Sequence, residues 1–235
     1  MASREIALGS AEAFAGTAAV ERGLVEMCRR GDAEAFARLV SLHESMVYNL
    51  AARLLGDGEE ARDLSQDVFL QVYRTLGGFE GRSSLKTWIY RIVVNQARNR
   101  QRWWRRRRRE RSCPIEDMTP ADHARAAACR PDADAPFERL ARGERARQLQ
   151  AALLKLSFDH RAILLLREVE GLDGDEIAAA LKIPPGTVKS RLARARESLR
   201  QAIAASVSVA RGAEFSSAQR AGGLGGAAQH PPARS

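Results

Sequence analysis

The sequence has few of the residues that build disulfide-bonded or metal-stabilised folds. It contains three cysteines, Cys28, Cys113 and Cys129, an odd number whose spacing fits no pair of metal ligands. His123 lies six residues before Cys129, which is not a zinc-binding spacing. We therefore predict no structural disulfide, no metal and no cofactor, in a reducing, cytoplasmic setting.

Long hydrophobic runs and catalytic constellations are also missing. No stretch approaches the roughly 20 apolar residues needed to cross a bilayer, and Glu5 lies where a signal peptide carries positive charge, so membrane insertion and export are not predicted. The carboxylates of Asp63 and Asp67 have no nucleophile with a base, no metal-ligand set and no Gly-rich phosphate loop to accompany them. The sequence therefore predicts a protein that is not an enzyme.

Positive charge is concentrated in one stretch, Phe79 to Arg111. From Arg82 to Arg111, 12 Lys and Arg residues against one Glu give about +11, whereas the whole chain carries +9. The arginine run alone is equally compatible with a solvated tail, but it continues a helical pattern that has its own apolar face. That face consists of Leu85, Trp88, Ile89, Ile92 and Val93, and beside it lie Arg91, Asn95, Arg98 and Arg102. We interpret this stretch as a folded helix that binds a polyanion, with nucleic acid favoured.

The segment before the basic helix has a polar surface of a different kind. Its apolar positions (Ala61, Leu64, Val68 and Val72) recur at helical spacing. The acidic and amide side chains of Asp63, Gln66, Asp67 and Gln71 lie away from that side. Without chemistry to perform, this surface is expected to face solvent or a partner.

A helix-turn-helix is predicted near the end of the patterned sequence. Asp173 and Glu176 have the capping-box spacing, Pro184-Pro185-Gly186 ends one helix, and Thr187 is expected to cap the next. In the second helix an inward face is predicted for Val188, Leu192, Ala195 and Leu199. The opposite face holds Thr187, Ser190, Arg191 and Arg194, with Lys189 and Arg196 at its flank. Such a face suits the major groove of DNA.

These motifs together resemble bacterial RNA polymerase sigma factors of the extracytoplasmic-function (ECF) type, over residues 21–111 and 139–203. The resemblance rests on Gly31-Asp32 with Ala35-Phe36, on Asp63 to Phe69, on Thr87 to Ile92 with Asn95, on Glu176-Ile177-Ala178, and on Gly186 to Leu192 with Arg194-Ala195-Arg196. It implies an all-α fold of two small helical domains, a region 2 bundle and a region 4 helix-turn-helix, joined by a flexible linker. The expected boundaries are 1–19 (flexible), 20–111 (region 2), 112–137 (linker), 138–205 (region 4) and 206–235 (disordered tail).

The resemblance also implies partners and a division of labour. It implies that the chain binds core polymerase and directs promoter recognition, strand opening and initiation, in a stress or envelope response and under an anti-sigma factor. Binding to the clamp helices of the largest polymerase subunit would involve Asp63, Gln66, Asp67, Phe69 and Gln71. Recognition of the −10 element would involve Phe79, Arg82, Ser84, Lys86, Arg91, Asn95, Arg98 and Arg102. The −35 element would be read by Thr187, Lys189, Ser190, Arg191, Arg194 and Arg196.

Departures from the family pattern and two rival interpretations stay open. Asn99 stands where the family usually has Asp, and Trp103-Trp104 precede five consecutive arginines. One rival is a dimeric helix-turn-helix regulator, which would bind a palindromic operator without polymerase. The other is an RNA-binding protein that uses Arg98 to Arg111, which would bind RNA without residues 139–203.

Overall fold

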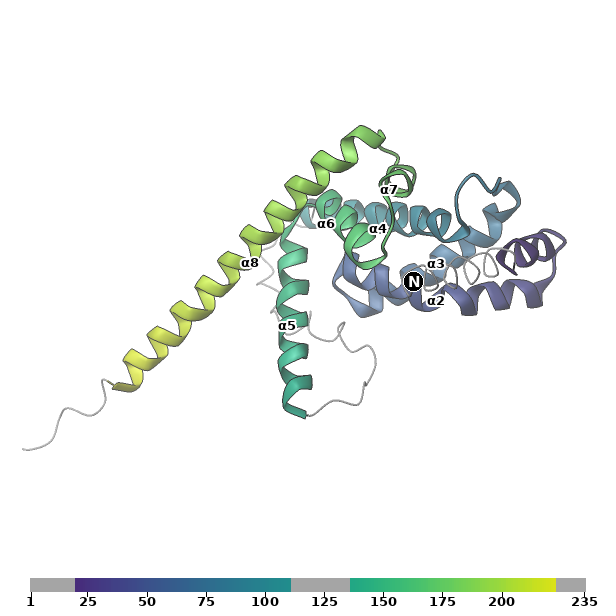
Figure 1. The fold of residues 1–235 in the computed structure, drawn as a ribbon. Helices are drawn as coiled ribbons and strands as arrows, with labels where there is room; N and C mark the ends of the chain where they lie inside the picture. The colour runs from purple at the N-terminus through teal and green to yellow at the C-terminus, as the bar shows by residue number, and fades with distance from the viewer. Residues whose placement is uncertain (1–19, 111–135, 223–235) are drawn as a thin grey trace, which may run out of the picture.

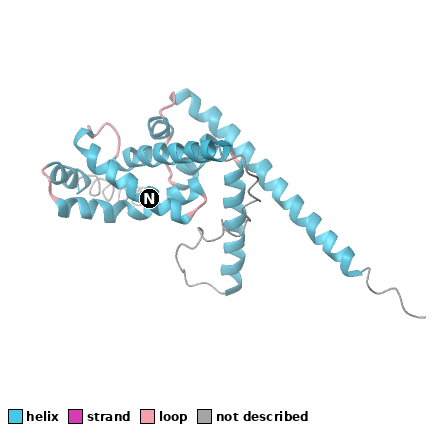
Figure 2. Cartoon of the chain, turned by 180° about the vertical axis from the view of Figure 1, so that it is seen from behind, coloured by secondary structure: helices cyan, strands magenta, loops and turns pink. Residues whose placement is uncertain are grey.

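The computed structural model describes residues 20–110 and 136–222, and the regular elements of these ranges are all helical (Figures 1 and 2). The all-α prediction is confirmed. The predicted segment 1–19, most of the predicted linker and the last residues of the chain lie outside the described ranges. The elements are a helical segment 20–29, α2 (Ala33–Leu55), α3 (Gly58–Thr75), η1 (Leu76–Gly78), α4 (Leu85–Glu110), α5 (Pro136–Lys155), α6 (Phe158–Leu164), η3 (Leu165–Val169), α7 (Gly174–Leu181) and α8 (Pro185–Gly222).

Short polar side chains set the starts of the helices. The carboxylate of Asp32 accepts hydrogen bonds from the amides of Glu34 and Ala35, and Asp57 caps α3 in the same way. Gly56 ends α2 in the left-handed conformation, with φ 77°, which a residue with a Cβ adopts only at a cost. Ser84 caps α4, because its Oγ accepts from the Thr87 amide at 3.0 Å.

The first half of the molecule is a bundle in which α2, α3 and α4 pack together. Its core includes apolar positions that the helical spacing predicts, such as Val68, Val72 and Ile89, which are fully buried. Trp88 is also buried, as predicted, and its ring packs on Phe79 with centroids 5.4 Å apart. The loop between α3 and α4 is thereby held against the bundle.

The second half contains the predicted helix-turn-helix, formed by α7 and α8. The capping box of Asp173 and Glu176 is present, and Lys182 ends α7 in the left-handed conformation. The prediction that Thr187 caps the second helix is wrong: α8 starts at Pro185, since the fixed φ of proline suits the first helical position. The predicted disorder from residue 206 is also contradicted as far as Gly222, where α8 ends. This part of the sequence is rich in alanine, which favours a helix without any apolar period.

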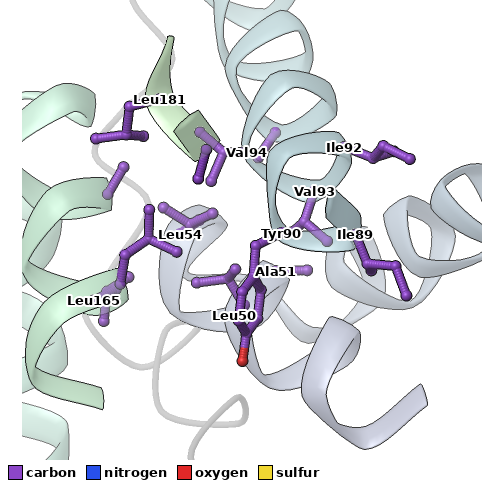
Figure 3. Close-up of a cluster of buried hydrophobic side chains, with 14 of the residues drawn as sticks. Leu50, Ala51, Leu54, Ile89, Tyr90, Ile92, Val93, Val94, Leu165 and Leu181 are labelled. Carbon is purple, nitrogen blue, oxygen red and sulfur yellow. The ribbon is translucent and has the colours of Figure 1, made fainter. Parts of the chain in front are cut away.

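The two halves are not separate bodies, because their buried apolar side chains form one continuous core. In Figure 1, α7 lies beside α4, and α5 meets the end of α2. The close-up in Figure 3 shows Leu165 and Leu181 of the second half facing Leu54 of α2 and Val94 of α4. The sequence predicts two domains on a tether and contains no signal for this packing.

Polar groups at the edge of this shared core also join the two halves. Thr87 Oγ1 lies 3.0 Å from Glu176 Oε1, and the hydroxyl of Tyr90 donates to the carboxylate of Glu170. Burial, followed by the hydrogen bond to Glu170, raises the pKa of the Tyr90 phenol, which stays a donor at neutral pH. Glu170 directly follows the π-helical turn η3, which positions its side chain toward α4.

A buried arginine joins two helix ends at the same junction. Arg161 of α6 is 2% exposed and donates hydrogen bonds to the backbone carbonyls of Leu153, Leu154 and Leu156 at the end of α5. It also donates to the carbonyl of Leu54 at the end of α2. Burial lowers the pKa of Arg161 to about 10, so the side chain remains charged at neutral pH. Carbonyl groups at helix C-termini compensate this charge.

A buried histidine gives the first half a dependence on pH. His43 of α2 is buried with its Nε2 3.7 Å from Glu21 Oε1, and burial, assisted by Lys86, lowers the pKa of its imidazole. The unfolded chain takes up a proton near pH 6.5 while the folded chain does not, so stability is lost as the pH falls below about 6.5. Burial raises the pKa of the Glu21 carboxyl above 4.5, so this group has the opposite effect. Its contribution to stability is lost as the pH rises from about 4.5.

We expect the midpoint temperature of unfolding to decrease as the pH is lowered from 7.5 to 5.5. We expect the substitution His43→Gln to make this decrease smaller. The measurement is thermal unfolding followed by circular dichroism at each pH. His160→Gln, at a half-buried position of α6, is the matched control and should keep the wild-type slope. Equal slopes in wild type and His43→Gln would contradict the assignment.

Candidate DNA and polymerase interfaces

The surface of α8 that the sequence assigns to DNA remains accessible in the packed molecule. Val188, Leu192 and Ala195 are buried, as predicted from the helical period. On the other side Lys189, Ser190 and Arg194 are exposed, and Thr187 and Arg191 are half-buried. The two residue classes therefore lie on opposite faces, an arrangement that suits a helix with one side in the major groove.

The six residues proposed for the −35 element differ in their local contacts. Arg196 forms an ion pair with Glu168, at 2.7 Å between Arg196 Nη2 and Glu168 Oε1. Ser190 Oγ donates to the carbonyl of Thr187 at 3.1 Å within the first turns of α8. Arg196 is thus fixed at the edge of the face and is less suited to base contacts than Arg191 or Arg194.

The eight residues proposed for the −10 element fall into several groups. Ser84 is engaged as the helix cap, and Phe79 is held by Trp88 and by Arg29, which donates to the Phe79 carbonyl. Arg82 pairs with Glu80 on the exposed loop. These residues shape the entry to α4.

Two of the proposed −10 residues, Arg91 and Asn95, line a polar hollow on one side of α4. The other lining residues come from α3, η1, α4 and the end of α7: Gln71, Thr75, Gly78, Trp88, Ile92, Gln96, Asn99 and Lys182. Amide side chains have both donors and acceptors, and they match the edges of nucleobases. This hollow is the best-formed candidate for base contacts on α4.

The remaining three lie elsewhere on α4. Arg98 faces the second half, where its guanidinium lies 2.9 Å from Asp159 and over the ring of Phe158, so it is engaged in the packed form. Lys86 lies over the Tyr90 ring at 5.5 Å, and Arg102 is exposed. The structure therefore brings Arg91 and Asn95 together and separates Arg98 from them.

The proposed polymerase-binding residues divide between two sides of α3. Gln66 and Phe69 line an apolar groove between α2 and α3, whose other lining residues are Phe36, Val40, Glu44, Ser45, Tyr48, Arg62, Ser65, Leu70 and Tyr73. Asp67 instead pairs with Arg100 of α4 at 3.2 Å, and Gln71 lines the polar hollow. Asp63 is exposed. The groove has the apolar side chains that a partner helix would bury, since Leu70 is 53% and Tyr73 61% exposed.

Several residues of these surfaces were not predicted. Leu70 and Tyr73 were not predicted as partner-binding residues, because that prediction was based on the acidic and amide positions of α3. Asn99 follows Asn95 by four residues and Gln96 by three, so these amides along one side of the helix were a usable signal.

Within residues 20–110 and 136–222, no helix is long and apolar enough to span a membrane. In the same ranges, no group of three or more His, Cys, Asp or Glu side chains is placed to hold a metal ion.

Comparison with known proteins places both halves in one family. Residues 39–110 match the family model of Sigma-70 region 2, and residues 146–199 match that of Sigma-70, region 4. The RNA polymerase sigma-H factor of Pseudomonas aeruginosa is 36% identical over 185 residues, which cover 78% of this chain and 93% of that protein. The ECF RNA polymerase sigma-E factor of Escherichia coli strain K12 is 36% identical over 177 residues, covering 75% and 90%.

Solved structures show the same fold. The sigma factor RpoE from Bartonella quintana, solved in complex with the anti-sigma factor NepR, is 25% identical with a TM-score of 0.56, over 72% of this chain and 96% of that one. CnrH, solved with the cytosolic domain of CnrY, is 24% identical with a TM-score of 0.54, over 79% and 98%. With both regions matched in order and relatives covered almost end to end, this chain belongs to the sigma-70 family of RNA polymerase sigma factors, in its ECF group.

Proposed function

We propose that this chain is a dissociable initiation factor that directs core RNA polymerase to its promoters. It contributes recognition and no catalytic residue: α8 reads the −35 element as duplex, α4 contacts the −10 element as the strands open, and the groove between α2 and α3 binds the clamp helices of the largest polymerase subunit. It acts in the cytoplasm, where polymerase and promoter DNA meet. The observation that carries the proposal is the ordered match of both sigma regions on a chain whose basic surfaces lie on α4 and α8.

The test is transcription reconstituted from the purified chain, core polymerase and DNA of the source genome, with start sites mapped. The expected result is a set of transcripts that share −10 and −35 sequences and that disappear when the chain is left out. If core polymerase binds the chain yet starts at no promoter, the proposal fails. An operator-binding regulator would instead bind palindromic DNA without polymerase.

Reading both promoter elements requires the two halves to separate. Elements named −10 and −35 lie about 25 base pairs apart, which is roughly 85 Å along B-DNA. In the packed form α7 lies against α4, so α8 and the −10 face cannot reach both elements at once. The 111–135 segment between α4 and α5 is long enough to allow separation. We infer that an anti-sigma partner, like those in the solved complexes of related factors, holds the chain inactive.

Arg191 tests the reading face of α8. We predict that Arg191→Ala weakens binding to the preferred −35 sequence by about 1 to 3 kcal/mol if it contacts a guanine, and relaxes preference at one base pair. Competition binding between promoter variants, with reconstituted holoenzyme, measures both effects. Arg200→Ala is the control, because Arg200 pairs with Glu197 beyond the proposed face and should leave base preference unchanged. Unaltered promoter choice in Arg191→Ala would remove Arg191 from the reading face.

A further inference from the structure

The far end of α4 carries a second hollow that the −10 assignment does not use. Among residues 85–107 of α4, the last buried one is Ala97, yet the helix continues to Glu110. Beyond Ala97, one side of it encloses a hollow of about 550 Å³, within the size range of small-molecule sites. Its lining residues are Glu60, Leu64, Gln96, Asn99, Arg100, Trp103, Trp104 and Arg106.

The lining of this hollow combines an aromatic ring, amides and positive charge. Trp103 is 50% exposed, and the guanidinium of Arg107 lies 4.8 Å from the centre of its ring. Exposed tryptophan is costly to leave in water, and here nothing in the bundle requires it, because the α4 core ends at Ala97. An aromatic platform beside arginines is the combination with which proteins bind single-stranded nucleic acid.

The acidic groups at the hollow are outweighed by arginines. Arg100 Nη1 lies 2.9 Å from Glu60 Oε2, and Arg100 Nη2 lies 3.2 Å from Asp67 Oδ2, so one guanidinium is shared by two carboxylates and the three groups leave one negative charge. Arg106 at the rim and Arg107 over the Trp103 ring, both exposed, add two positive charges and make the local balance positive. An anionic ligand is favoured over a cationic or neutral one.

The two hollows of α4 form one continuous face. Gln96 and Asn99 line both of them, and at 100° per residue Trp88, Asn95, Asn99 and Arg106 lie on the same side of the helix. Tyr90 and Arg98, which contact the second half, lie on the opposite side, and Lys182 at the end of α7 borders only the first hollow. A strand that follows α4 from the −10 hollow would therefore reach Trp103 next, roughly 18 Å along the helix from Arg91.

We propose that the hollow at Asn99, Trp103 and Arg106 binds one nucleotide of single-stranded DNA, with its base stacked on the Trp103 ring and its phosphate beside Arg106. The site lengthens the strand-binding face of α4 beyond the −10 residues. The inference rests on the proposed function for the source of the strand, since promoter opening supplies it.

The probe is a fluorescein-labelled 12-nucleotide oligothymidylate, compared with a duplex of the same length, binding to the full chain in low salt. Trp103→Leu is expected to weaken binding of the single strand about tenfold and to leave duplex binding unchanged, because stacking contributes only to an unpaired base. Arg105→Ala removes an exposed charge that does not line the hollow, and should weaken both probes equally.

The inference is overturned if Trp103→Leu binds the single strand as wild type does, or if it weakens both probes to the same extent. Tighter binding of an oligouridylate than of the oligothymidylate, lost in Trp103→Leu, would identify an RNA site and also overturn it. None of these outcomes depends on transcription, so a failure to start transcripts would reject the proposed function and leave this test standing. Circular dichroism of Trp103→Leu verifies that α4 remains folded.

Discussion

Replacing Arg161 with methionine is expected to lower the free energy of unfolding by about 3 kcal/mol. Methionine replaces only the aliphatic part of the side chain and donates no hydrogen bond, so the carbonyls of Leu54 and Leu156 lose this donor in a buried place, while that of Leu153 keeps the Leu156 amide. Each unsatisfied buried acceptor costs about 1 to 3 kcal/mol, and partial hydration at the helix ends reduces the sum. Urea unfolding followed by circular dichroism measures the loss.

Arg167→Met is the matched control, because Arg167 makes one hydrogen bond, to the carbonyl of Leu172 five residues away. We expect it to cost about 1 kcal/mol. The Leu54 carbonyl belongs to the first half, so Arg161→Met should also loosen the contact between halves and increase the radius of gyration in small-angle X-ray scattering. A variant as stable and as compact as wild type would show that Arg161 does not join the helix ends.

Arg161 also shows where prediction from the sequence stops. The inward residues of α8 and the core face of α4 follow from a helical period, and the capping box follows from two residues at a fixed spacing. The partner of Arg161 lies 107 residues away, and its local sequence, Asp159-His160-Arg161, resembles an exposed turn of helix. A period within one helix reports which side is buried, but not which distant carbonyl or carboxylate lies opposite.

The site residues on α8 could be predicted from the helical period, and those on α3 only in part, for the same reason. Residues of α8 could be sorted because one helix supplies both the buried and the exposed face. On α3 the acidic and amide residues were treated as one surface, whereas the structure turns Asp67 and Gln71 toward α4 and Gln66 toward α2. The orientation of α3 between two neighbours determines this division, and it depends on packing across all three helices.

The apolar groove between α2 and α3 is expected to contribute strongly to the affinity for core polymerase. We predict that Leu70→Asp weakens binding to core polymerase about 30-fold or more, because a charge placed in the groove must lose its hydration when a partner helix is buried there. The expected change of about 2 kcal/mol is that of an interface hot spot. Fluorescence polarisation of the labelled chain, titrated with core polymerase, measures the affinity.

Leu42→Asp is the matched control, since Leu42 of α2 is 58% exposed, close to the 53% of Leu70, but does not line the groove. Both leucines are largely in water, so neither substitution should unfold the bundle, and a difference in polymerase binding reports on the groove itself. If Leu42→Asp weakens binding and Leu70→Asp does not, the polymerase contacts another side of α2. If only Leu70→Asp weakens binding to core polymerase, the side chains that hold the polymerase are Leu70 and its apolar neighbours Phe69 and Tyr73. The carboxylates of α3 then contribute at the rim of the interface, where water screens their charge.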